Sequence, residues 1–532
     1  MTANPSLSRR RLLQTAAGGG AALAVLGAAG CRSAVSRAAG STGEAGRPVR
    51  GGTINAGITT DLIPGNFFTN TTEGITVLIG LAFDTLIRYR ADSITPTPWL
   101  ATSWQLADDG RSLTLDLRDD VRFHSGRPFT AKDVEFSIRT YADPLWTAQL
   151  KSTAAAVTSF DTTDPYRIVL GFAHPLGNIF DLLDTVPIVD SETLGDLRNG
   201  SRFIGTGPFR VTGWTPNSRL SFERNPDYWV PERPYADAVE VTVIPDAKAL
   251  LSALRSGQID FAEGLSYLDT ATVTSRSGFA DLQLTGAEKQ LYVGSNVRAK
   301  PLDDPRVRQA IAYALDRDRI VAEVLRGVGY PINLPWPRYS PAFDAARNST
   351  YTRDLARAKE LVAQVGTLPT IPFTYTSPQP LLDPTAAIIQ ADLAEVGIAV
   401  ELQPIDNSQF AKQLIGAKFP GLWLAIHSWA QYTPSTLTVS AYPFNAHKNA
   451  SQFTSERYIA AADAAWSIPD GDSPQARQAY AKVSDNLLDS LFLSEIAIAL
   501  PQWARSTRLQ GTGWTKRSEV LLTDAWLTGD RP

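Results

Sequence analysis

One segment, residues 422–442, combines aromatic and hydrogen-bonding side chains in the way that a small-molecule site requires. Its first residues are apolar and predict a strand that ends at His427, where Ser428 and Trp429 follow. A strand with such an end presents its last side chains to a loop, and loops carry many binding residues. We therefore predict that His427, Ser428 and Trp429 line a ligand pocket.

Catalytic chemistry finds little support in the sequence. The motifs HExxH, GxSxG and CxxC are absent, and the chain has four histidines and one cysteine. The acidic pair Asp303-Asp304 stands where a helix begins, so we interpret it as a cap. His427 has no second histidine at metal-binding spacing. We expect no catalytic residues, no metal and no cofactor; the competing class is a secreted hydrolase with an unrecognised carboxylate pair.

Length and composition indicate a soluble protein of several lobes. The chain has 532 residues, of which 43% are hydrophobic and 20% charged, and its mean hydropathy is −0.12. One hydrophobic core rarely supports such a length, and the composition excludes both disorder and a multi-span membrane protein. The net charge is −4 without a basic run, so nucleic acid is not an expected partner.

The amino terminus has the features of an export signal. Ser8–Leu13 contains a twin-arginine motif, and residues 12–29 form an apolar run rich in Ala and Gly. Ala28–Cys31 fits a lipobox, which predicts that residues 1–30 are removed and Cys31 is lipidated. Residues 31–50 then form a flexible tether. The alternative is a retained amino-terminal membrane anchor.

The elements that must position these residues alternate between strands and helices, which predicts an α/β fold. Asp304 and Asp316 are expected helix caps, and Val77–Ile87 has helical apolar spacing. Further expected strands are Thr53–Ile58, Tyr166–Phe172, Val239–Ile244, Ile371–Thr376 and Ile398–Ile405. Further expected helices are Ala247–Ser256, Leu355–Val365, the segment around Ile388 to Val396 and a long one after Gln475.

Residues 98–137 contain clear local signals for a strand and a capped helix. Leu113, Leu115 and Leu117 alternate with polar residues, as in a half-buried strand. Farther on, Thr130 and Asp133 have the spacing of a capping box that opens a helix. None of these side chains has the chemistry of a catalytic group, so we interpret the run as structural.

The same run closely resembles the signature region of the family 5 extracellular solute-binding proteins, the peptide, dipeptide and nickel-type receptors of bacterial ABC importers. Two further phrases are similar to those of the family: residues 205–209, GTGPF, and residues 220–229, LSFERNPDYW. The matching residues of the run are Pro98, Leu100-Ala101, Ser103-Trp104, Asp108-Asp109-Gly110, Leu117-Arg118, Val121, Phe123-His124, Gly126, Pro128-Phe129-Thr130-Ala131, Asp133-Val134 and Phe136-Ser137.

The resemblance implies a periplasmic binding protein-like α/β fold of type II, with two large lobes, a hinge and a smaller extra domain. Such lobes close on a ligand by hinge motion. The implied domains are residues 51–94, 204–294 and 500–532 for lobe I, 95–203 for the extra domain and 295–499 for lobe II.

The resemblance also implies a function. It predicts the substrate-binding lipoprotein of an ABC importer, which captures a small solute, most often a peptide or peptide-like compound, and delivers it to a membrane permease. We expect a monomer that is exported and held by the lipid on Cys31 at the outer face of the cytoplasmic membrane, periplasmic or at the cell surface. The alternative to a permease as partner is a sensor to which the loaded binding protein would bind.

In peptide-binding members of the family, a phrase W-x-ADY-x-(D/E)P supplies an Asp that pairs with the α-ammonium group of the peptide. Here Gln431, followed by Tyr432, stands where that Asp is expected, and a neutral amide cannot compensate a buried ammonium. Either Asp61 or Asp406 replaces it, or the ligand lacks a free ammonium and is a sugar, an opine-like conjugate, a modified peptide or a metal chelate. Trp503 falls where relatives present an aromatic ring to the ligand; its alternative role is core packing.

Overall fold

The computed structural model describes residues 47–69, 72–146 and 148–529. The predicted signal, Cys31 and most of the predicted tether lie outside these residues, so their assignments stay predictions. Within the described ranges, every helix is too short or too polar to span a membrane.

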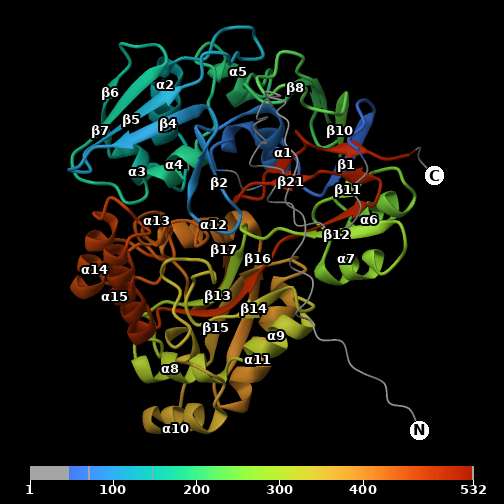
Figure 1. Cartoon of the computed structure of the whole chain (residues 1–532). Coiled ribbons are helices and arrows are strands. Elements are labelled where there is room, and N and C mark those ends of the chain that lie inside the picture. Colours follow the sequence, from blue (N-terminus) through green and yellow to red (C-terminus); the bar gives the residue numbers. More distant parts are fainter. Residues whose placement is uncertain (1–46, 70–71, 147, 530–532) are drawn as a thin grey trace, which may run out of the picture. The chain divides into compact units, whose positions relative to one another are not determined.

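A seven-stranded sheet organises the part of the fold that we call the first lobe (Figure 1). Its central strand β1 pairs in parallel with β10 on one side and with β11 on the other. Helices α1 (Glu73–Ala82), α6 (Ala247–Arg255) and α7 (Tyr267–Thr274) accompany the sheet. In sheet order the strands are β12 (Phe279–Gln283), β19 (Gln502–Ser506), β11 (Phe261–Ala262), β1 (Thr53–Ile58), β10 (Ala238–Val243), β9 (Arg219–Arg224) and β8 (Phe209–Thr215).

A six-stranded sheet organises the second lobe. The predicted helix caps are confirmed, because Asp304 accepts a hydrogen bond from the Arg306 N–H at 2.8 Å and Asp316 accepts one from the Arg319 N–H at 3.0 Å. In sheet order the strands are β14 (Gly329–Pro331), β18 (Leu493–Ala499), β13 (Lys289–Ser295), β17 (Leu422–His427), β15 (Ile371–Thr376) and β16 (Val400–Ile405). The accompanying helices are α8 (Pro305–Ala314), α9 (Arg317–Glu323), α10 (Leu355–Val365), α11 (Leu382–Glu395) and α12 (Asn407–Gly416).

A four-stranded antiparallel sheet contains the run that resembles the family signature. In β5 the side chains of Leu113, Leu115 and Leu117 are buried, which confirms the predicted half-buried strand. The capping box is also present, because Asp133 accepts from the Thr130 N–H at 2.8 Å. The strand order is β4 (Ala101–Leu106), β5 (Ser112–Leu117), β7 (Arg167–Phe172) and β6 (Val157–Asp161), with helices α2 (Ala131–Ala142), α3 (Lys151–Ala155), α4 (Ile179–Thr185) and α5 (Leu194–Asn199).

The predicted helix over Val77–Ile87 is wrong at its carboxyl end. Helix α1 stops at Ala82, and the chain continues extended into strand β2 (Ile87–Tyr89), which pairs with β3 (Pro96–Pro98). Tertiary contacts outweigh the apolar spacing here, because buried Asp84 accepts from the indole N–H of Trp99 at 2.7 Å. A helix through this segment would forgo that bond.

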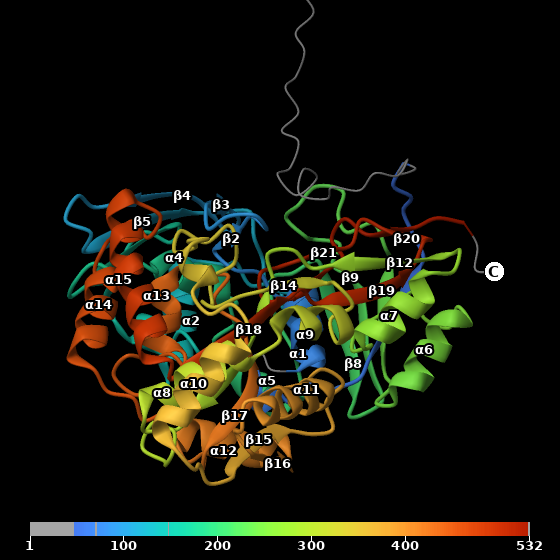
Figure 2. The same ribbon diagram turned by 90° about the horizontal axis from the view of Figure 1, so that it is seen from below.

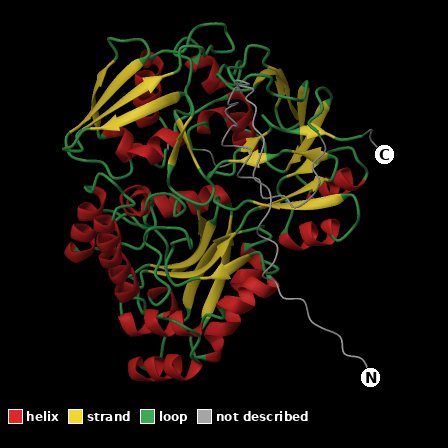
Figure 3. Cartoon of the chain, viewed as in Figure 1, coloured by secondary structure: helices red, strands yellow, loops and turns green. Residues whose placement is uncertain are grey.

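Three helices follow β17 in the chain: α13 (Pro434–Ser440), α14 (Glu456–Trp466) and α15 (Pro474–Ser490). Helices α14 and α15 lie side by side, as Figure 2 and Figure 3 show. The sequence predicted the long α15 but not α13. Two short strand pairs, β20 (Leu509–Gln510) with β23 (Trp526–Leu527) and β21 (Gly513–Trp514) with β22 (Val520–Leu521), end the described chain.

Candidate functional site

The loop between β17 and α13, residues 428–433, carries most of the predicted ligand-binding residues. Trp429 has φ +107°, a conformation that side-chain-bearing residues rarely adopt and that often marks functional sites. Its ring stacks on Tyr432 with centroids 5.3 Å apart, and the guanidinium of Arg517 lies 5.6 Å from the Trp429 ring. Ser428 is half-buried at the start of the loop. The structure therefore brings Trp429 and Tyr432 into one aromatic cluster.

Gln431 connects this loop to the carboxyl-terminal segment of the chain. The backbone N–H of Trp429 donates to the Gln431 Oε1, and the Gln431 Nε2 donates to the carbonyl of Lys516 at 2.8 Å. Both ends of the buried amide are thus occupied. In this conformation Gln431 holds the loop in place, and its predicted contact with a ligand stays a prediction.

Two carboxylates that sequence reasoning missed reach the loop from α4. Asp181 accepts from the Thr433 N–H at 3.1 Å and from the Thr436 hydroxyl at 2.6 Å. Asp184 accepts from the Tyr432 hydroxyl at 2.8 Å. No acidic residue stands between Trp423 and Asn449, but α4 supplies two. The signal in the sequence was their spacing of three residues within an otherwise apolar helix.

Burial controls the electrostatics of these groups. Desolvation raises the pKa of Asp181 to about 6 and raises that of Asp184, while hydrogen bonds from Thr436 and Tyr89 oppose the change at Asp181. The Tyr89 hydroxyl donates to Asp181 at 2.7 Å. The hydrogen bonds that the Asp181 carboxylate accepts from Tyr89, Thr433 and Thr436 thus come from hydroxyl groups and from one backbone N–H. Through them Asp181 anchors the 428–433 loop to α4.

His427 ends β17, directly opposite Gln290 of β13. Both side chains are buried, and the His427 Nδ1 and both amide atoms of Gln290 have no hydrogen-bond partner among the described residues. Phe444 lies edge-on to the His427 ring at 5.7 Å. Desolvation lowers the pKa of His427 to about 3, so the ring is neutral at physiological pH.

This pKa predicts an acid sensitivity that belongs to His427. In the folded state the His427 ring takes up a proton only near pH 3, whereas in the unfolded chain it does so near pH 6.5. The contribution of neutral His427 to the unfolding free energy is therefore fully present above pH 6.5 and is lost as the pH falls below that value. Between pH 6.5 and 4.5 we expect a loss of roughly 2 to 3 kcal/mol in unfolding free energy. Urea unfolding at both pH values measures it.

His427→Gln removes the titrating group and should flatten this part of the pH profile. The matched control is His447→Gln, because His447 is exposed and bonded to Asp463. An unchanged profile in His427→Gln, relative to the control, would contradict the assignment.

Two more of the predicted residues, Trp503 and Asp61, lie in the first lobe. Trp503 of β19 is buried against Phe261, with ring centroids 5.0 Å apart. Asp61 accepts from the indole N–H of Trp214 at 3.1 Å and from the Asn217 N–H at 2.6 Å, partners that belong to the β8–β9 hairpin. The alternative candidate Asp406 caps α12 by accepting from the Gln409 N–H at 2.9 Å. Both carboxylates thus have structural partners within the fold.

A further polar group stands beside Trp503. Glu263 and Glu73 are half-buried carboxylates that interact electrostatically, and Lys289 of β13 acts on both of them. The Trp503 side chain donates a hydrogen bond to Glu263. Across the described chain, no group of three His, Cys, Asp or Glu side chains is arranged to hold a metal ion.

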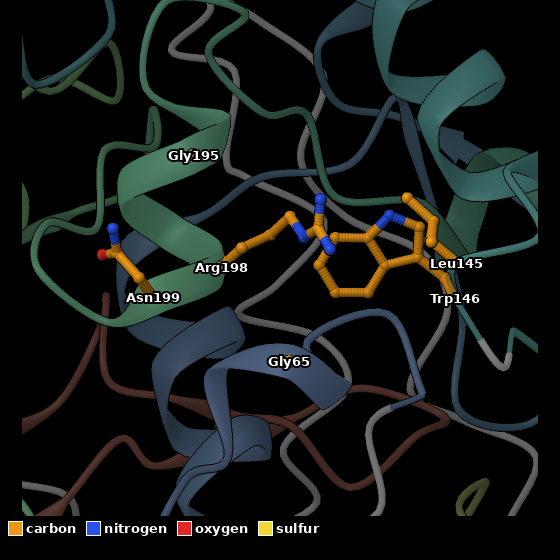
Figure 4. A pocket seen from close by; sticks show the side chains of 6 residues that line it. All are labelled: Gly65, Leu145, Trp146, Gly195, Arg198 and Asn199. Carbon is orange, nitrogen blue, oxygen red and sulfur yellow. The ribbon is translucent and has the colours of Figure 1, made fainter.

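Two surface hollows lie away from the predicted residues. One, of about 350 Å³, is lined by the exposed Leu145, by Trp146 and by polar groups of α5 (Figure 4). The Arg198 guanidinium lies 5.7 Å from the Trp146 ring. The other, of about 200 Å³, is lined by residues 341–344 and by Arg347, Arg477 and Ala481. Neither hollow contains a residue that the sequence predicted for ligand binding.

Comparison with known proteins identifies the fold. The chain is similar to the structure of the binding protein AgaA of Agrobacterium tumefaciens R10 in complex with agropinic acid, with a TM-score of 0.78, 23% identity, and coverage of 90% of this chain and 99% of that one. It is also similar to the structure of AppA of Bacillus subtilis with a nonapeptide, with a TM-score of 0.77, 22% identity, and coverage of 91% and 100%. These are type II periplasmic binding proteins, so the predicted fold class is confirmed.

Sequence comparison identifies the family. The oligopeptide-binding protein AppA of Bacillus subtilis is 27% identical over 404 residues, which cover 70% of this chain and 72% of AppA. The di/tripeptide-binding protein 2 of Pseudomonas aeruginosa is 28% identical over 383 residues, or 65% and 70%. The model of the bacterial extracellular solute-binding proteins, family 5, matches residues 95–451. The proteins of this family bind solutes for ABC transporters and are not enzymes, which confirms that prediction, and the chain belongs to family 5 of the bacterial extracellular solute-binding proteins.

Proposed function

We propose that this protein is the substrate-binding lipoprotein of an ABC importer, that it captures a small peptide or peptide-like solute between its two lobes, and that it delivers this solute to a membrane permease. The observation that carries the proposal is the 428–433 loop. It belongs to the second lobe and is bonded to α4 and to the carboxyl-terminal segment. A loop that joins parts of the chain in this way is suited to sense a ligand at their junction.

The unpartnered polar atoms of Gln290 and His427 support a binding site near this loop. Buried polar groups without partners are rare and costly in folded proteins. A polar ligand would supply their hydrogen bonds, while Trp429 and Tyr432 would offer it aromatic surface. Tighter binding to the closed arrangement of the lobes would shift the population toward it, and the permease would recognise the loaded form.

A second candidate ligand class is a non-peptide solute such as an opine-like conjugate. The neutral Gln431 favours it, because the loop lacks an acidic residue of its own. The complex of AgaA with agropinic acid supports it from a relative. The same lobes and the same delivery to a permease apply to this candidate.

The test is to identify what the protein carries. We would purify the soluble form that begins after Cys31, denature it and analyse the released small molecules by mass spectrometry. Released short peptides are the expected result. A released conjugate, sugar or chelate would favour the second candidate. Conversion of a solute by the protein would contradict a pure binding function.

A further inference from the structure

A carboxylate pair stands at the carboxyl ends of two parallel strands in the first lobe. Strands β1 and β11 run side by side in parallel. Glu263 follows β11 directly, and its backbone N–H donates to the Gly57 carbonyl of β1 at 3.0 Å. Glu73 begins α1 and accepts from the backbone N–H of Thr59, just beyond β1. Ligands of open α/β sheets bind beyond this edge of the strands, so the pair is placed where a ligand would arrive.

The two carboxylates differ in their hydrogen bonds. Glu73 accepts from the Thr59 hydroxyl at 2.9 Å and from the Thr60 N–H at 3.1 Å, in addition to the Thr59 N–H. These hydrogen bonds hold the Glu73 carboxylate against the residues that follow β1. Glu263 receives one hydrogen bond from the Trp503 side chain, and its buried Oε2 has no partner among the described residues. Glu263 is therefore the member of the pair with a free acceptor.

The two carboxylates share one nearby cation, Lys289. Burial raises the pKa of Glu263 well above its ordinary value, the charge of Glu73 raises it further, and Lys289 lowers it. Burial also raises the pKa of Glu73, while its hydrogen bonds from Thr59 and Thr60 and the charge of Lys289 oppose this rise, so one nearby cation serves two carboxylates. The raised pKa values mean that the pair takes up a proton readily when no further cation is present, and a cationic partner that donates to Glu263 would favour its ionised form instead.

The backbone holds Glu263 firmly in this place. Gly264 has φ +100°, and a Cβ atom added there would lie 2.7 Å from the Glu73 Oε1 and 2.6 Å from the Thr59 hydroxyl oxygen. Only glycine fits so close an approach. The segment is thus fixed against Glu73, which pre-organises the Glu263 carboxylate.

On the basis of the proposed function, we propose that Glu263 binds a cationic group of the ligand, namely a primary ammonium such as the amino terminus of a short peptide. The ammonium supplies a second positive charge beside the two carboxylates and donates to the Oε2 of Glu263. Glu73 positions the strand end beside it. The neutral Gln431 leaves the binding of an ammonium group unassigned in the second lobe, and Glu263 would supply it from the first. Asp61 and Asp406 are less suited, because both already accept structural hydrogen bonds.

The test compares two peptides that differ only in the amine. Isothermal titration of ligand-stripped protein would use Ala-Ala-Ala and N-acetyl-Ala-Ala-Ala with the wild type, with Glu263→Gln and with Glu223→Gln. Glu223 is an exposed carboxylate on β9 of the same sheet, so it is the matched control. We expect the wild type and the control to prefer the free amine at least tenfold. Glu263→Gln should bind the free peptide at least tenfold more weakly and the acetylated one as before.

Failure of this inference differs from failure of the proposed function. If the wild type binds and Glu263→Gln binds both peptides like the wild type, the role of Glu263 is overturned while the proposed function stands. If the wild type binds neither peptide and releases none, the peptide function fails. The melting temperature of the ligand-free variants then decides on Glu263: removal of a carboxyl group whose ionised form is disfavoured by burial and by Glu73 should raise it in Glu263→Gln relative to Glu223→Gln, and an equal or lower value overturns the inference.

Discussion

Replacing Asp181 with alanine is expected to lower the free energy of unfolding by about 3 to 5 kcal/mol. The buried carboxylate accepts from the Tyr89 hydroxyl, from the N–H and hydroxyl of Thr433 and from the hydroxyl of Thr436. Alanine leaves all four donors without an acceptor in a place that water does not reach. Because Tyr89 and Thr433 belong to distant parts of the chain, the variant also loses a connection between α4 and the second lobe.

Urea unfolding followed by tryptophan fluorescence measures this effect. Asp119→Ala is the control, because Asp119 is exposed two residues after the end of β5. We expect the control to stay within about 0.5 kcal/mol of the wild type. A loss below about 1 kcal/mol in Asp181→Ala would show that the network around α4 does not stabilise the fold.

Gln431→Glu is expected to cost about 3 to 4 kcal/mol at pH 8, although the two side chains have nearly the same shape. The amide Nε2 of Gln431 donates to the carbonyl of Lys516 at 2.8 Å. An ionised glutamate would place an acceptor against that acceptor, without water to separate them. The 428–433 loop would then lose its bond to the carboxyl-terminal segment.

The pH dependence of this variant identifies the cause. The new carboxyl group can donate to the Lys516 carbonyl only when it is protonated, so its folded-state pKa rises above the ordinary value of about 4.3. The loss of stability is therefore small below that value and grows as the pH rises through the folded-state pKa. Chemical unfolding at pH 4.5 and pH 8 compares the variant with Gln478→Glu, an exposed position on α15. A loss that does not depend on pH would rule out this explanation.

Local signals in the sequence predicted local structure well. The capping box of Thr130 and Asp133, the caps Asp304 and Asp316, and the alternating leucines of β5 all depend on neighbours within a few residues, and the structure contains each of them. The type II fold came from the resemblance of the signature run, because no local pattern fixes how the lobes are assembled.

The candidate site was harder to predict, because its partners are far apart in the chain. Asp181 and Thr433 are separated by 252 residues and Gln431 and Lys516 by 85. A missing acid in the loop was visible in the sequence, but the carboxylates that approach the loop from α4 were not. Gln290 was missed for the same reason, since only the register of β13 with β17 places it opposite His427.

The position of β19 has a consequence for how the chain is made. This strand lies between β11 and β12, and β12 has β19 as its neighbour in the sheet. Its residues, 502–506, leave the ribosome after every strand of the second lobe, whereas β1 emerges before them. The first lobe thus cannot complete its sheet while the second lobe, whose strands end at Ala499, is still being synthesised. The first lobe begins before the second and is completed after it, and its edge strand β12 has no neighbour in the sheet until β19 has been made.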